Sequence, residues 1–158
     1  MKEEVFSTFN KQGYYIARGL FSQDAISYLE KEFDKIVNQM NASNENINAR
    51  WGSELTKTIE DPKSIVLHTH NVQSYSQKML NMVQDKHLLD LVESLIGPDI
   101  ILHHTKLFLK PPKIGSAFPL HQDWSYFPTQ SNSMIAAVVH ISKSKENMGR
   151  IRLVKGSH

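Results

Sequence analysis

Hydrophobic residues in two stretches of the first hundred positions recur at the spacing of amphipathic helices. In the first stretch they fall mostly three or four positions apart after Ser22, at Ile26, Leu29, Phe33, Ile36, Val37 and Met40. Ser22 suits a helix N-cap, and Asp24 suits the positive end of the helix dipole. The second stretch runs from Asp85 to the Gly97-Pro98 pair, a sequence at which helices commonly end. The pattern therefore predicts two helices that each cover a core with one face.

The second half of the chain changes from helical spacing to the alternation typical of strands. Residues 100–110 alternate between two faces that both carry large apolar side chains, which predicts a strand buried on both sides. Residues 133–141 are mostly apolar and predict a further strand. The asparagine-rich residues 41–48 predict a loop, and the stretch that continues to Pro62 is a candidate active-site flap.

Composition and charge describe an ordinary globular chain. Its 158 residues suit one domain, and 40% hydrophobic and 22% charged residues lie in the usual range. The formal net charge is only +2 and acids and bases are interspersed, which argues against a nucleic-acid partner. Cysteine is absent, which excludes disulfides and thiolate metal sites and fits a reducing compartment. No apolar run is long enough to span a membrane and the N-terminus lacks a signal core, so we expect a cytoplasmic protein without a membrane partner.

The most informative chemistry lies in the tripeptide His121-Gln122-Asp123. Residues two apart on an extended chain point to the same side, so the imidazole of His121 and the carboxylate of Asp123 can bind one metal ion while Gln122 faces away. Such a pair supplies two of the three ligands of a site with two histidines and one carboxylate, the kind that binds Fe(II) and keeps open positions for substrate and oxygen. The sequence therefore predicts that His121 and Asp123 are metal ligands.

The order of short motifs around this tripeptide resembles the phytanoyl-CoA dioxygenase family of Fe(II)- and 2-oxoglutarate-dependent oxygenases. The shared motifs are Lys110-Pro111-Pro112, His121-Gln122-Asp123, Tyr126-Phe127-Pro128, Glu146-Asn147-Met148-Gly149 and Gly156-Ser157-His158. Residues 9–16 are similar to the strand that opens the family's domain. The resemblance thus runs through the whole chain.

The resemblance implies a mainly β fold with added α-helices: a double-stranded β-helix, or cupin-like jelly roll, with N-terminal helices outside one sheet. It implies a dioxygenase with Fe(II) and 2-oxoglutarate as cofactors and ascorbate as a reductant. Such an enzyme decarboxylates 2-oxoglutarate to succinate while it hydroxylates a small organic molecule with molecular oxygen. Phytanoyl-CoA itself is not implied, because members of the family act on very different small molecules.

Two further residues become candidates for cofactor binding through the resemblance. Lys106 lies between apolar neighbours on its predicted strand face, where an ammonium group needs an anion or a route to water. The matching position in the family contacts 2-oxoglutarate, so Lys106 is a candidate ligand for a carboxylate of that cosubstrate, with a solvent-exposed lysine as the alternative. Val139 matches another position that lines the same pocket, although a core role is the ordinary reading of a valine. The adjacent His103 and His104 should point to opposite sides of their strand and not bind one ion together.

The family's second histidine ligand and its 2-oxoglutarate arginine lie beyond the Gly156-Ser157-His158 motif. We therefore expect one domain over residues 1–158 that is incomplete at its C-terminus, with a helical part in residues 1–98 and the first barrel strands in residues 99–158. The open sheet edges of such a half barrel would favour self-association. Two functions remain open at this point: an oxygenase, or a non-catalytic jelly-roll module that binds or assembles.

Overall fold

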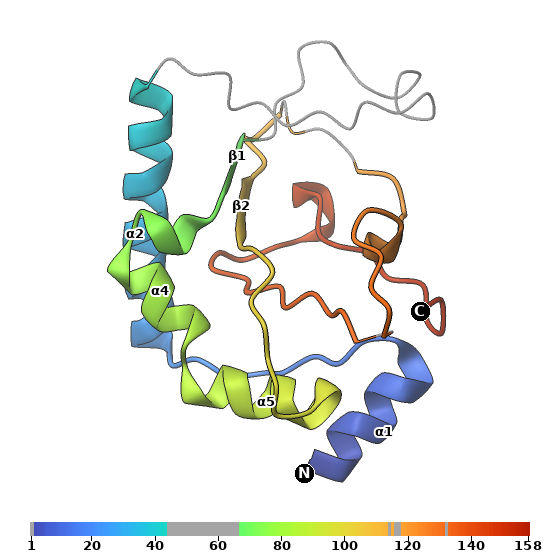
Figure 1. The fold of residues 1–158 in the computed structure, drawn as a ribbon. Helices are drawn as coiled ribbons and strands as arrows, with labels where there is room; N and C mark the ends of the chain where they lie inside the picture. The colour runs from blue at the N-terminus through green and yellow to red at the C-terminus, as the bar shows by residue number, and fades with distance from the viewer. Residues whose placement is uncertain (1, 44–66, 114, 116–117, 132) are drawn as a thin grey trace.

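The computed structural model describes residues 2–43, 67–113, 115, 118–131 and 133–158 (Figure 1). Its α-helices are α1 (Lys2–Gln12), α2 (Gln23–Ala42), α4 (Gln77–Val83) and α5 (Lys86–Ile96). Its strands are β1 (Leu67–His70) and β2 (Lys106–Leu109), and its 3-10 turns are η1 (Val72–Ser74), η2 (Asp123–Ser125) and η3 (Glu146–Met148). Most of the loop and flap expected between residues 41 and 62 falls outside the described residues. No helix in the described ranges has the length and apolar character needed to cross a membrane.

The two helices predicted from hydrophobic spacing are confirmed as α2 and α5. Ser22 caps α2 as expected, because its hydroxyl oxygen accepts a hydrogen bond from the Ala25 amide at 3.1 Å. Asp85 caps α5 in the same way with its carboxylate, and Gly97 follows the last helical residue. Local sequence thus sets where both helices begin and end.

The hydrophobic core lies between α2, η1, α4 and β2. Its buried members are Leu29, Ile36, Val37, Val72, Met79 and Leu107. One charged group lies beside it: the buried Glu32 carboxylate accepts a 2.7 Å hydrogen bond from the Ser76 hydroxyl. Lys78 lies 3.3 Å and Lys35 3.8 Å from the same carboxylate, so the buried charge is paired. These contacts fasten α4 and the segment after β1 to α2.

The expected jelly roll is wrong. The described regular structure is mostly helical, and β1 and β2 form one two-stranded antiparallel sheet in which Thr69 pairs with Leu107 and His70 with Lys106. Residues 100–105 and 133–141 belong to no strand or helix. A strand needs a hydrogen-bonded neighbour, and apolar alternation alone does not supply one. Burial differs too, because Leu107 is buried while Lys106 and Phe108 are exposed.

The N-terminus also differs from the expected opening strand. Residues 2–12 form α1, which packs against α5, and Tyr14 to Ala17 lie outside any helix or strand. Figure 1 shows the C-terminal end of the chain close to the end of α1, and the Gly156 amide donates a 2.8 Å hydrogen bond to the Gln12 carbonyl. The two ends of the sequence are therefore joined in space.

Candidate functional site

His121 and Asp123 face each other, as their spacing predicts. The Nε2 atom of His121 lies 3.4 Å from the Oδ1 atom of Asp123. The pair does not lie on a strand, because Asp123 is the first residue of η2. Gln122 between them is nevertheless extended, with φ −114° and ψ 129°, and one extended residue is enough to turn its two neighbours to the same side. Whether this pair binds a metal stays a prediction.

The imidazole of His121 is held in an orientation that suits a metal ligand. Its Nδ1 atom lies 2.8 Å from the Pro119 carbonyl oxygen. A carbonyl oxygen only accepts, so Nδ1 carries the proton, and Nε2 in the neutral ring is the nitrogen with the lone pair. Metal-binding histidines commonly donate their second ring N–H to a carbonyl in this way. Two electron-pair donors, Nε2 and the Asp123 carboxylate, thus point at the same space.

The separation of these two atoms fits adjacent ligand positions on one cation. Ligand atoms about 2.1 Å from a metal ion and at right angles to each other are roughly 3 Å apart, close to the observed 3.4 Å. Within the described part of the chain no group of three or more histidine, aspartate or glutamate side chains could hold a metal ion. The spacing of the pair therefore allows two ligands to one cation, and the described residues offer no third beside them.

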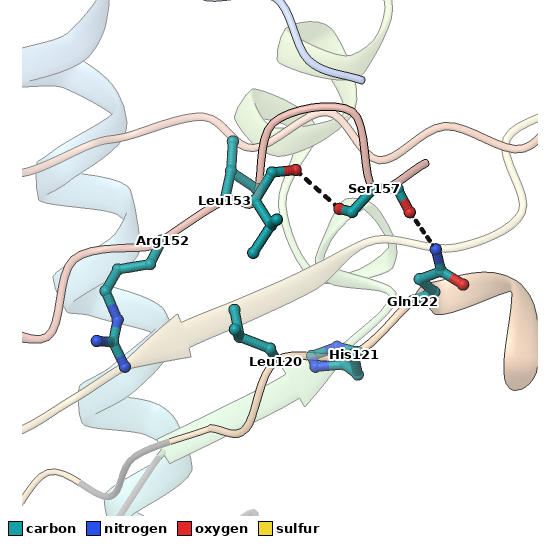
Figure 2. Close-up of a pocket in the computed structure, with 7 residues that line it drawn as sticks. Leu120, His121, Gln122, Arg152, Leu153 and Ser157 are labelled. Atoms are coloured by element: carbon teal, nitrogen blue, oxygen red, sulfur yellow. Dashed lines mark hydrogen bonds between the residues drawn. The ribbon is translucent and has the colours of Figure 1, made fainter. Parts of the chain in front are cut away.

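A pocket of about 270 Å³ opens beside the imidazole (Figure 2). Its lining residues are Leu120, His121, Gln122, Arg152, Leu153, Val154 and Ser157. They come from two segments, the one that carries His121 and the one that ends in the Gly156-Ser157-His158 motif. Figure 2 shows a hydrogen bond across the pocket, in which the side-chain amide of Gln122 donates to the Ser157 carbonyl. The hydroxyl of Ser157 in turn donates to the Val154 carbonyl at 2.8 Å.

Aromatic side chains after Asp123 contact residues just before β2. The Tyr126 ring meets His121 edge-on with 6.2 Å between ring centres. Phe127 lies 5.1 Å from the ring of His103 and 5.2 Å from that of His104. The expectation that these two histidines point apart is wrong: their Nδ1 atoms are 2.6 Å apart, because residues 103 and 104 are not in a strand.

Imidazoles gather near Lys106 on the exposed side of the β1 and β2 pair. His70 lies 5.8 Å from His104 between ring centres, and Lys106 is paired with His70 across the sheet. Burial is the largest cause that lowers the pKa of His70, followed by the charge of Lys106. Burial also lowers the pKa of His104, helped by His103 and Lys106 and opposed by Asp123. At neutral pH the rings of His70 and His104 are therefore uncharged.

The structure separates the two cofactor candidates from the pocket. Lys106 is exposed, with its Nζ atom 5.1 Å from the centre of the Phe108 ring, and Val139 is half-buried in a segment outside any helix or strand. Neither residue lines the pocket beside His121. Their roles toward 2-oxoglutarate stay predictions.

Two pocket residues escaped the sequence reasoning. Arg152, which belongs to none of the motifs, lines the pocket, and Gln122 reaches Ser157 instead of only facing away from His121 and Asp123. No pattern in the sequence signals either contact, since each joins segments about thirty residues apart.

Three curated relatives show what kind of protein this chain resembles. The probable alpha-ketoglutarate-dependent hypophosphite dioxygenase of Stutzerimonas stutzeri is 26% identical over an alignment of 165 positions. The alignment covers 88% of this chain and 54% of the relative. The peroxisomal phytanoyl-CoA dioxygenase of Bos taurus is 27% identical over 95% of this chain and 45% of its own length. The ectoine dioxygenase of Sphingopyxis alaskensis is 20% identical over 96% of this chain and 48% of its own length.

The chain spans about half the length of the curated relatives it matches. No solved structure gives a significant match. The model of the family described as phytanoyl-CoA dioxygenase (PhyH) matches residues 9–158, a range that contains His121 and Asp123, the pocket and both cofactor candidates. This chain therefore belongs to the phytanoyl-CoA dioxygenase family.

Proposed function

We propose that this chain serves an Fe(II)- and 2-oxoglutarate-dependent dioxygenase, in which His121 and Asp123 hold the iron. The family uses Fe(II) and 2-oxoglutarate. The observation that carries the proposal is the 3.4 Å approach of His121 Nε2 to Asp123 Oδ1, with the other imidazole nitrogen bound to a carbonyl. Bound iron would supply the oxidation, in which 2-oxoglutarate gives succinate and carbon dioxide while oxygen hydroxylates a small organic molecule.

Neighbouring protein groups would orient His121 and Asp123 toward the metal ion. The Pro119 carbonyl keeps the proton of His121 on Nδ1, so that Nε2 presents its lone pair to the metal. Tyr126 packs edge-on against the same ring and limits its rotation. The Asp123 carboxylate, at the start of η2, supplies negative charge that favours a divalent cation at this place.

Lys106 and Val139 are the proposed contacts for 2-oxoglutarate. Lys106 is an exposed cation without a carboxylate partner within the described ranges. A lysine ammonium pairs well with a carboxylate, and such charge-assisted hydrogen bonds are stronger than neutral ones. Val139 would give the cosubstrate an apolar wall. The matching positions in the family support both assignments.

The pocket beside His121 suits a small substrate that carries an anionic group. Arg152 lines it, and no carboxylate of the described residues pairs with its guanidinium; the neighbouring Arg150, by contrast, lies 3.6 Å from Glu146. An arginine that has no carboxylate partner among the described residues and shares a pocket with a proposed metal ligand is suited to hold a carboxylate or phosphorus oxyanion. The relatives are named for hypophosphite, phytanoyl-CoA and ectoine, so the identity of the small molecule is left open.

Metal titration with a matched control tests the proposal. Fe(II) or Co(II) is titrated anaerobically into the chain and into variants with His121→Ala or Asp123→Ala, which should each lose most of the binding. The control is His87→Ala: His87 also lies 3.3 Å from an aspartate two residues away, but that Asp85 carboxylate is engaged in capping α5. Equal binding by the wild-type and His121→Ala proteins would refute the iron site.

A non-catalytic binding or assembly module derived from the family is the second candidate. The absence of a three-residue metal cluster from the described residues favours it. Succinate release in the presence of Fe(II), ascorbate and 2-oxoglutarate distinguishes the two, since only the oxygenase produces it.

A further inference from the structure

The end of α1 carries a glycine that a second segment of the chain touches closely. Gly13 follows the helix with φ +80°, and its amide donates a 2.7 Å hydrogen bond to the Phe9 carbonyl. A Cβ atom placed on Gly13 would lie 2.5 Å from Nδ1 and 2.8 Å from Cγ of His158. Non-bonded contacts that short are essentially never seen for a Cβ atom, so the imidazole of His158 packs on Gly13 because that residue has no side chain.

The same end of α1 binds the turn that contains His158. The Gly156 amide donates a 2.8 Å hydrogen bond to the carbonyl of Gln12, the last residue of the helix. The ring of Phe9 lies 6.3 Å from that of His158. Helix ends leave carbonyl groups unpaired, and Gly156 satisfies one of them. Three contacts therefore hold residues 156–158 against α1.

The turn then reaches the proposed iron ligands through one side chain. The Ser157 carbonyl accepts a hydrogen bond from the side-chain amide of Gln122, the residue between His121 and Asp123 (Figure 2). Gln122 is the extended residue whose backbone turns both ligands to the same side. A constraint on its side chain is thus a constraint on the ligand geometry.

We propose that Gly13 is a positioning residue: by admitting His158 it holds the 156–158 turn on α1, and that turn fixes Gln122 between the two iron ligands. This inference rests on the proposed function for its last step, the effect on metal binding. The first steps concern the protein alone and can be tested without metal.

Digestion with trypsin under native conditions tests whether Gly13 holds the 156–158 turn on α1. Arg152 and Lys155 are exposed, and trypsin should cleave after them faster when residues 156–158 leave their place on α1. Gly13→Ala should raise that cleavage rate at least tenfold, about 1.4 kcal/mol of opening free energy. Gly19→Ala is the matched control, because Gly19 also has a positive φ of +68° but nothing within 4 Å of its Cβ position. In a His158→Ala background, where the imidazole is gone, Gly13→Ala should cost no more than Gly19→Ala.

Transmission to the ligand segment is tested by amide exchange at Tyr126, whose N–H donates to the Asp123 carbonyl at 2.9 Å. Gly13→Ala should speed this exchange several-fold, and Gln122→Met, which keeps the side-chain length and removes the amide, should abolish the effect of Gly13→Ala. Co(II) affinity should fall several-fold in Gly13→Ala and stay unchanged in Gly19→Ala.

A Gly13→Ala variant that is cleaved at the wild-type rate would show that Gly13 does not hold the 156–158 turn on α1. Faster cleavage with unchanged exchange at Tyr126 would overturn the positioning role. A wild-type chain that binds no Co(II) would instead refute the proposed iron site, while the cleavage and exchange results would still decide whether Gly13 positions Gln122.

Discussion

Replacing Ser76 with alanine should destabilise the protein far more than the loss of an ordinary helix cap. The Ser76 hydroxyl donates a 2.7 Å hydrogen bond to the buried Glu32 carboxylate and also accepts from the Met79 amide at 3.4 Å as the cap of α4. A hydrogen bond to a charged group contributes about 1.5–3 kcal/mol. A cap contributes about 0.5–2 kcal/mol, and the 3.4 Å distance puts this one at the low end. We expect a loss of roughly 2–4 kcal/mol from the free energy of unfolding.

Urea denaturation followed by circular dichroism measures the loss, with Ser22→Ala as the control. Ser22 caps α2 from an exposed position, where its hydroxyl accepts from the Ala25 amide and donates to no buried carboxylate of the described residues, so its replacement should cost about 1 kcal/mol. The Ser76 hydrogen bond is also the largest cause that lowers the pKa of Glu32 below its ordinary value of 4.5. The stability from a lowered carboxyl pKa is present above that value and lost as the pH falls through the folded-state pKa. The difference between wild type and Ser76→Ala should therefore shrink below pH 4.5. Equal costs for the two serine variants would refute the buried charge network.

Three further outcomes are expected. Lys106→Met, which keeps the stem and removes the charge, should weaken 2-oxoglutarate binding to the Co(II)-loaded chain by about tenfold in calorimetry; an unchanged affinity would leave Lys106 as a surface residue. Arg152→Gln should weaken the binding of inorganic phosphate, observed by NMR titration, whereas Arg150→Gln should not; equal losses would point to general charge instead of a pocket. The lowered pKa values of His70 and His104 make folding less favourable as the pH falls below 6.5, so the melting temperature should drop between pH 7 and 5.5. Replacing both histidines by glutamine should flatten the dependence of the melting temperature on pH. The same slope in the wild type and the double variant would contradict this prediction.

Helices α2 and α5 were predictable because their signals are local. The apolar positions of α2 all lie within five turns of one another, and Ser22 and Asp85 cap through atoms two or three residues away. The sheet was not predictable, because a strand forms only where another segment of the chain pairs with it through backbone hydrogen bonds. Leu107 has such a partner in Thr69, and residues 133–141 have none within the described chain.

The features of the site also separate into those set by local sequence and those set by the packing of distant segments. The facing of His121 and Asp123 follows from one extended residue between them, so spacing alone predicted it, although η2 replaced the expected strand. The contact of Gln122 with Ser157 and the place of Arg152 depend on how distant segments pack. His103 and His104 show the limit most directly: periodicity sent them apart, and an irregular backbone brought them together.

The uneven burial of the chain bears on how any metal affinity should be understood. Every buried residue in the described ranges lies at or before Leu107, whereas the segment that carries His121 and Asp123 has exposed apolar side chains such as Leu120 and Trp124. Such a segment costs little free energy to disorder locally. Metal that binds only its ordered form would hold it there by mass action, by about 2.7 kcal/mol at a concentration one hundred times the dissociation constant. The measured binding free energy would then be the intrinsic binding free energy of the ligands, reduced by the free energy needed to order the segment.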